Sequence, residues 1–87
     1  MRTHVMKVYT LYFNKEEYRV FNKITDILDY STFEIEDEMI VVVNGHKVLE
    51  DIILLLKSAA NQQEYLEHNC EAAENIRYIM YTISEIL

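Results

Sequence analysis

The sequence predicts an α+β fold: a four-stranded antiparallel sheet, made of two hairpins, followed by two helices packed on one face. Three observations support this prediction. β-Branched and aromatic residues are concentrated before Gly45, the apolar pattern changes to a helical period after it, and strands and helices occupy separate blocks. We expect a single domain, residues 1–87, that is mostly β over 1–45 and mostly α over 46–87, because a chain this short builds one core.

The first predicted hairpin joins residues 5–13, VMKVYTLYF, to residues 17–23, EYRVFNK. Both stretches are rich in β-branched and aromatic residues, and the NKE between them can form a short turn. Alternation is imperfect, because Val8, Leu11 and Phe13 do not keep to one face. We therefore expect a sheet that is apolar on both sides in places, or an edge that meets another surface.

The second predicted hairpin follows a connection over residues 24–31, ITDILDYS. Thr25 can cap one helical turn in this connection, and a loop is the alternative. The last strand, residues 39–43, is the apolar run MIVVV, which is typical of a strand buried on both faces. Asn44-Gly45 ends it, because glycine takes a positive φ without strain.

The strand over residues 32–36, TFEIE, has the cleanest alternation in the chain. This pattern predicts a half-buried strand with Phe33 and Ile35 facing the core. Glu34 and Glu36 then project into solvent.

Two helices are expected after Gly45. Residues 46–58 have a wide apolar face at helical spacing, which comprises Val48, Leu49, Ile52, Ile53, Leu55 and Leu56. A second, long helix is predicted over residues 62–86, and the helical segment can break near Asn61. An alternative makes Asn44-Gly45 a hairpin turn and residues 46–50, HKVLE, a fifth strand.

The last predicted helix has two contrasting faces. One face is apolar and is expected in the core, with Tyr65, Ala72 and Ile79 at its margin; it comprises Leu66, Ala73, Ile76, Met80, Ile83 and Leu87. The opposite face is an acidic stripe that two tyrosines continue, and it comprises Glu64, Glu67, Glu71, Glu74, Tyr78 and Tyr81. Like charges at this spacing cost roughly 0.2–0.5 kcal/mol per pair. The stripe is therefore either a solvated face of helix-forming glutamates or a contact ridge for a partner.

A second acidic cluster, EIEDE, occupies residues 34–38. Glu34 and Glu36 belong to the expected solvent side of a strand, and Asp37 and Glu38 belong to a tight reversal. If the two acidic sets share a face, they present eight carboxylates to a partner.

The net charge favours a basic protein as the partner. The formal net charge is −7, whereas DNA and RNA binding depends on lysine and arginine neutralising phosphates. Direct nucleic-acid binding is therefore disfavoured, and an anionic membrane surface would repel the chain. A negative field instead favours basic surfaces, including those of nucleic-acid-binding effectors, although acidity can also serve solubility alone.

Motifs for catalysis, cofactors and metals are absent from the sequence. One glycine excludes a Gly-rich phosphate loop, and neither G-x-S-x-G nor CxxC occurs. Glu64, Glu67, His68 and Glu71 share a predicted helix, but di-iron bundles need Glu-x-x-His motifs on two helices. We expect no enzyme activity, no cofactor and no metal site. The single Cys70 and the absence of a signal peptide or membrane span favour a cytoplasmic location.

In size, charge and lack of catalytic motifs, the chain resembles phage-encoded inhibitors of host defence, such as anti-CRISPR and anti-restriction proteins, and bacterial immunity proteins. The resemblance implies a small acidic inhibitor that occupies a basic, nucleic-acid-binding surface of a partner protein. On this hypothesis the acidic stripe and residues 34–38 contact the partner by imitating a phosphate backbone. The protein would act in the host cytoplasm if it is phage-encoded.

The alternative function is a self-associating regulatory or interaction module, a homodimer with no inhibitory role. The imperfect alternation of the first hairpin makes Tyr9, Leu11, Tyr12 and Phe13 candidates for a dimer seam, formed by a sheet edge or a sheet face. A salt-insensitive dimer would favour this module, whereas a monomer that binds basic proteins in a salt-sensitive way would favour the inhibitor.

Overall fold

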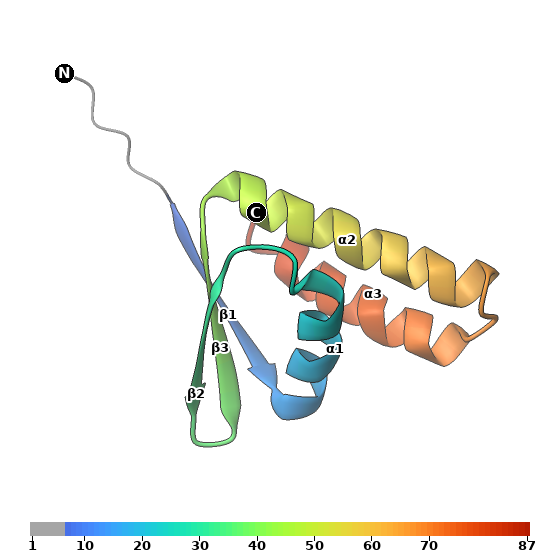
Figure 1. Cartoon of the computed structure of the whole chain (residues 1–87), viewed down its shortest axis with the longest axis horizontal. Helices are drawn as coiled ribbons and strands as arrows, with labels where there is room; N and C mark the ends of the chain where they lie inside the picture. Colours follow the sequence, from blue (N-terminus) through green and yellow to red (C-terminus); the bar gives the residue numbers. More distant parts are fainter. Residues whose placement is uncertain (1–6) are drawn as a thin grey trace.

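The computed structural model describes residues 7–87, in which three helices lie on one side of an antiparallel sheet (Figure 1). In chain order the elements are β1 (Val8–Asn14), α1 (Lys15–Thr25), β2 (Ser31–Ile35), β3 (Glu38–Asn44), α2 (His46–Tyr65) and α3 (Cys70–Ser84). The α+β class is confirmed. The described residues form three strands, however, so the predicted four-stranded sheet is wrong. Residues 5 and 6 of the first predicted strand lie outside the described residues.

The predicted strand over residues 17–23 is instead part of α1. Asn14 caps this helix: the Glu17 amide donates to Asn14 Oδ1 at 2.8 Å, and the Asn14 amide donates to Glu17 Oε1 at 2.9 Å. This reciprocal capping box satisfies two backbone donors and starts the helix. Phe21 is fully buried in the core, and Tyr18 packs against the core at its edge. Packing and capping therefore override the β propensity of these aromatic residues.

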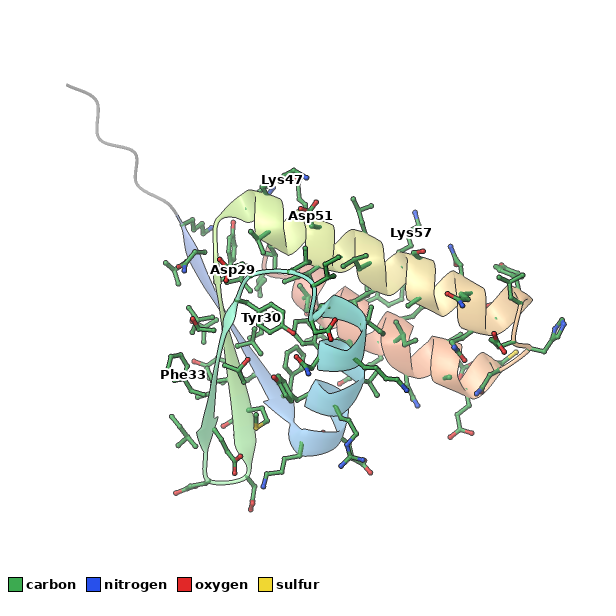
Figure 2. All side chains as sticks on the ribbon, viewed as in Figure 1. Asp29, Tyr30, Phe33, Lys47, Asp51 and Lys57 are labelled. Carbon is green, nitrogen blue, oxygen red and sulfur yellow. The ribbon has the colours of Figure 1, made fainter. Side chains whose placement is uncertain are left out.

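At the end of α1, a buried hydroxyl group, that of Thr25, binds a backbone carbonyl of the last turn. Thr25 is fully buried, its hydroxyl donates to the Phe21 carbonyl at 2.8 Å, and the Tyr30 hydroxyl lies 2.9 Å away. Figure 2 shows Tyr30 between β2 and α1. The prediction that Thr25 caps a new helical turn is wrong, because this hydroxyl closes the preceding helix instead. The alternative, a loop, is confirmed for residues 26–30.

The sheet has the strand order β1-β3-β2, and both pairs are antiparallel. β1 alternates between exposed and buried residues, so that Val8 lies on the face opposite to Leu11 and Phe13. The expectation of a sheet that is apolar on both sides in places is confirmed, because Val8 and Tyr12 are exposed on the uncovered face. The helix-covered face of β1 and β3 supplies the core of the sheet with Tyr9, Leu11, Phe13, Val41 and Val43. Three of the four predicted dimer-seam residues, Tyr9, Leu11 and Phe13, are consequently buried, and Tyr12 alone of that set is exposed.

The predicted orientation of β2 is reversed in the structure. Phe33 and Ile35 are 54% and 57% exposed, and Figure 2 shows Phe33 on the side of the sheet away from the helices. Glu34 faces the helices, where its Oε2 lies 3.3 Å from Lys15 Nζ. A strand's register decides which of its two faces is covered, and here the pairing of Phe33 with Ile40 puts the apolar face outside.

α2 starts directly after Gly45, which has a φ of 98°. Residues 46–50 are therefore helical, and the alternative of a fifth strand is wrong. α2 continues through Asn61 to Tyr65, so the expected break near Asn61 is also wrong.

The chain reverses over residues 66–69, and α3 then packs along α2 (Figure 1). His68 takes a φ of 55°, and Asn69 caps α3 by accepting a hydrogen bond from the Ala72 amide at 3.1 Å. The prediction of one continuous helix over 62–86 is wrong. No side chain between Ala60 and Ala73 is buried, so the reversal lies outside the core.

The core face predicted for the last helix is confirmed within α3 and fails beyond its ends. Ala73, Ile76, Met80 and Ile83 are buried, as is Ile79. Leu66 in the reversal and Leu87 after α3 are exposed, which corrects their predicted place in the core. Among residues 7–87, no helix is long and apolar enough to cross a membrane.

Candidate protein-binding surface

α3 keeps four of the six residues of the predicted acidic stripe together. Glu71 and Glu74 are exposed on the face opposite the core, and Tyr78 and Tyr81 continue the same face at 64% and 60% exposure. Large aromatic side chains of this kind are commonly covered when a protein binds a partner, because they offer a large contact area at low entropic cost.

Glu64 and Glu67 are separated from that face by the reversal between α2 and α3. Glu64 belongs to α2 and forms an ion pair with Arg77 of α3, which also donates to Asn61 Oδ1 at 3.1 Å. Hydrogen bonds from Arg77 and then from Tyr65 hold the pKa of the Glu64 carboxyl below its ordinary value of 4.5. This carboxylate therefore joins the two helices, and Glu67 lies in the reversal itself.

The second acidic cluster is divided between two surfaces. Glu36 and Asp37 form the two-residue turn between β2 and β3, with Glu36 at a φ of 58°, and Glu38 opens β3. All three are exposed. Glu34 is the exception, because Lys15 pairs with it on the helix-facing side of the sheet.

Two glutamates that were not predicted as site residues open α1. Glu16 and Glu17 lie in its first turn and line a groove of about 470 Å³ between α1 and α3, together with Glu71 and Tyr78. The positive end of the α1 dipole favours carboxylates at this position. Arg19, from the same helix, also lines the groove.

A second hollow connects this groove to the hairpin turn. It is lined by Glu36, Asp37 and Glu38, and it shares Asn14 and Glu17 with the groove. The acidic side chains along the two adjoining hollows form one continuous surface, which we call the acidic band: Glu16, Glu17, Glu36, Asp37, Glu38 and Glu71. Glu67 lines neither hollow, because it lies in the α2–α3 reversal just before the start of α3.

The part of the acidic band on α1 carries a sequence signal. Asn14 followed three residues later by Glu17 matches the capping-box pattern, which places both glutamates of α1 in a first helical turn. The neighbouring aromatic residues favoured a strand instead. With a strand over residues 17–23, the sequence does not predict that Glu16 and Glu17 connect the two acidic sets.

Tyr9, His46 and Glu50, which lie outside the acidic band, form a structural contact between β1 and α2. The Tyr9 hydroxyl lies 3.2 Å from Nδ1 of His46, and Nε2 of the same imidazole lies 2.7 Å from a Glu50 carboxylate oxygen. Tyr9 is only 6% exposed, so its hydroxyl offers no room for a substrate. Within residues 7–87, no three histidine, cysteine, aspartate or glutamate side chains are grouped as metal ligands would be.

Comparison of the chain with protein-family models, curated proteins and solved structures gives no match.

Proposed function

We propose that this protein binds a basic surface of a partner protein through the acidic band. The observation that carries the proposal is the sharing of Asn14 and Glu17 by the two hollows. Because of it, carboxylates from the hairpin turn, from α1 and from α3 face one continuous recess. A net charge of −7 adds long-range attraction toward a cationic partner.

The shape of the recess suits an extended basic element rather than a single ion. Its carboxylates come from three separate elements, and Tyr78 stands at the groove with most of its side chain exposed. An arginine side chain from a partner can pair with Glu16 or Glu71 and stack on this tyrosine. Several such contacts along the band would supply both affinity and orientation.

In its most specific form, the proposal is that of an inhibitor. A row of carboxylates on a rigid scaffold competes with the phosphates of DNA or RNA for the same lysine and arginine side chains. A phage-encoded inhibitor of host defence or an immunity protein would use this competition. The predicted consequence is that the protein and an oligonucleotide exclude each other from the partner.

The first prediction concerns charge reversal within the acidic band. In the double variant Asp37→Lys/Glu71→Lys, affinity for a short oligoarginine peptide should fall at least tenfold, about 1.4 kcal/mol. The measurement is isothermal titration calorimetry at low salt. Both positions are exposed, so the thermal unfolding transition should stay close to that of the wild type.

The matched control is the variant Asp26→Lys/Glu67→Lys, which makes the same change in net charge at exposed positions outside the band. It should retain most of the affinity. If the two variants lose affinity equally, the peptide responds only to net charge and the acidic band is not a binding site. Affinity capture with the wild type and these two variants then identifies the natural partner. A labelled oligonucleotide should displace the wild-type protein from that partner.

A further inference from the structure

A second surface, on the opposite side of the sheet from the helices, is apolar and uncovered. The strand register puts eleven residues on this outer face: Val8, Thr10, Tyr12, Asn14, Ser31, Phe33, Ile35, Glu38, Ile40, Val42 and Asn44. Glu38, next to the hairpin turn, is the one charged residue among them. Among residues 7–87, all helices pack on the other face (Figure 1), so no described element covers this one.

We propose that the outer face of the sheet binds a second copy of this chain, so that two three-stranded sheets stack face to face. The outer face adjoins the acidic band at the hairpin end, where Tyr12 and Ile35 also line the second hollow. The proposed interface replaces the buried dimer seam that the sequence predicts. Face-to-face packing of antiparallel sheets is a common way to bury apolar strand faces, with the sheets about 10 Å apart.

The orientation of β2 is the first argument for an interface. In a sheet with one solvated face, apolar residues point inward and polar residues point outward. β2 has the opposite arrangement, with Phe33 and Ile35 outside, while Thr32 accepts a hydrogen bond from the Tyr18 hydroxyl at 3.3 Å on the inner side. Glu34 pairs with Lys15 there as well. The apolar residues of this strand thus have no partner within the chain's described residues.

The exposed area is the second argument. Val8, Tyr12, Phe33 and Ile35 are each 54–60% exposed, which corresponds to about 400 Å² of apolar side-chain surface per chain. A stable interface buries roughly 600–1,000 Å² on each partner. The partly exposed Ile40 and Val42 and the polar Thr10 and Ser31 extend the patch toward this range.

The charge distribution indicates why the occupant is a second copy. The acidic band reaches this face only at Glu38, beside the hairpin turn, and the other ten residues of the face are uncharged. A basic partner attracted by the band would therefore find a single carboxylate on this face. A surface that is mostly apolar and uncharged is matched by the same surface of another copy, as an isologous two-fold interface requires.

The test is sedimentation equilibrium of the full chain over a range of concentrations. We expect a reversible dimer with a dissociation constant of about 10 µM, in keeping with an interface at the small end of the stable range. The variant Phe33→Lys should weaken the dimer at least tenfold. Lysine lowers the net negative charge, so added repulsion between chains cannot explain the loss.

The matched controls are Ile27→Lys and Leu54→Lys, two exposed apolar side chains away from the sheet. Both should dimerise like the wild type. A wild type that stays monomeric at about 1 mM, or a Phe33→Lys variant that dimerises normally, overturns the proposal. Equal weakening in the controls overturns it too.

A spin label gives a second readout that does not depend on disrupting the interface. The label is attached at Lys7→Cys, just before β1, where the native side chain lies over Tyr9 on the helix-covered side of the sheet. The labelled protein has a Cys70→Ser background and is mixed with isotope-labelled wild type. We expect intermolecular broadening of amide signals in the strands. Broadening confined to the helices, or none at concentrations where the dimer is populated, contradicts the stacking.

Discussion

At the scale of single residues, the least replaceable polar group is the hydroxyl of Thr25. It is fully buried, bonded to the Phe21 carbonyl and in contact with the Tyr30 hydroxyl, which donates to Asn22 Oδ1 at 2.9 Å. The ring centroids of Phe21 and Tyr30 are 5.4 Å apart. This small network fixes the connection between α1 and β2, because buried polar groups are costly when they lose their partners.

The network predicts an alkaline loss of stability. Burial, the largest cause, raises the pKa of the Tyr30 phenol above its ordinary value of 10.0, against an opposite effect of the Thr25 hydrogen bond. A raised pKa favours the neutral phenol in the folded state. The stability it contributes is present below about pH 10 and is lost as the pH rises through the folded-state pKa.

The variant Tyr30→Phe removes this titration. Its free energy of unfolding, measured by urea denaturation, should fall less steeply than that of the wild type above about pH 10. At neutral pH it should be about 1 kcal/mol less stable, because hydrogen bonds to Thr25 and Asn22 are lost. Tyr78→Phe, at an exposed position, controls for the loss of a hydroxyl. Parallel alkaline slopes for the wild type and Tyr30→Phe would contradict the prediction.

At the scale of secondary-structure elements, one substitution separates a helical hairpin from a continuous helix. Asn69→Ala removes the side chain that accepts the Ala72 amide at the start of α3. Loss of an N-cap costs about 1 kcal/mol, whereas alanine within a continuous helix would add stability. We therefore expect Asn69→Ala to lower the free energy of unfolding, measured by chemical denaturation.

The control for this prediction is the same replacement inside α3. Asn75 is exposed in the middle of the helix, so Asn75→Ala should raise the free energy of unfolding by about 0.5 kcal/mol. Opposite signs for the two alanine variants support the hairpin. A stabilising Asn69→Ala would show that α2 and α3 behave as one helix in solution.

The elements also show how far the sequence predicts the fold. β3 and α2 were predictable, because a short apolar run ends at Gly45 and a helical period follows. α1 was missed because its aromatic residues have β propensity, while its capping box, Asn14 to Glu17, depends on only two polar residues. The α2–α3 reversal has no glycine or proline to mark it, since His68 itself takes the positive φ.

The candidate site was predictable to a similar degree. Exposure of Glu71, Glu74, Tyr78 and Tyr81 follows from helical periodicity alone, which holds within α3. The continuity of the acidic band does not, because it requires α1 to stand between the hairpin turn and α3. The orientation of β2 was predicted the wrong way round. Alternation identifies the two faces of a strand, but only the strand register says which face is covered.

At the scale of the whole molecule, two proposed surfaces differ in their chemistry. The acidic band is formed by carboxylates along the hollows beside α1, whereas the outer face of the sheet is mostly apolar and has Glu38 as its one charged residue. Salt acts on these surfaces in opposite directions. It screens the attraction of the band for a cationic partner, and it also screens the repulsion between two chains that each carry a net charge of −7.

We therefore predict opposite salt dependences in one protein. Raising the salt concentration from about 0.05 M to about 0.3 M shortens the screening length from about 14 Å to about 6 Å. This change should weaken oligoarginine binding and leave the dimer as stable or more stable. Calorimetry with the peptide and sedimentation equilibrium of the protein alone measure the two effects. The variant Phe33→Lys should keep the salt-sensitive peptide binding while losing the dimer, and Asp37→Lys/Glu71→Lys should do the reverse. If a single variant abolishes both properties without unfolding the protein, the two surfaces are not separate and one of the two assignments is wrong.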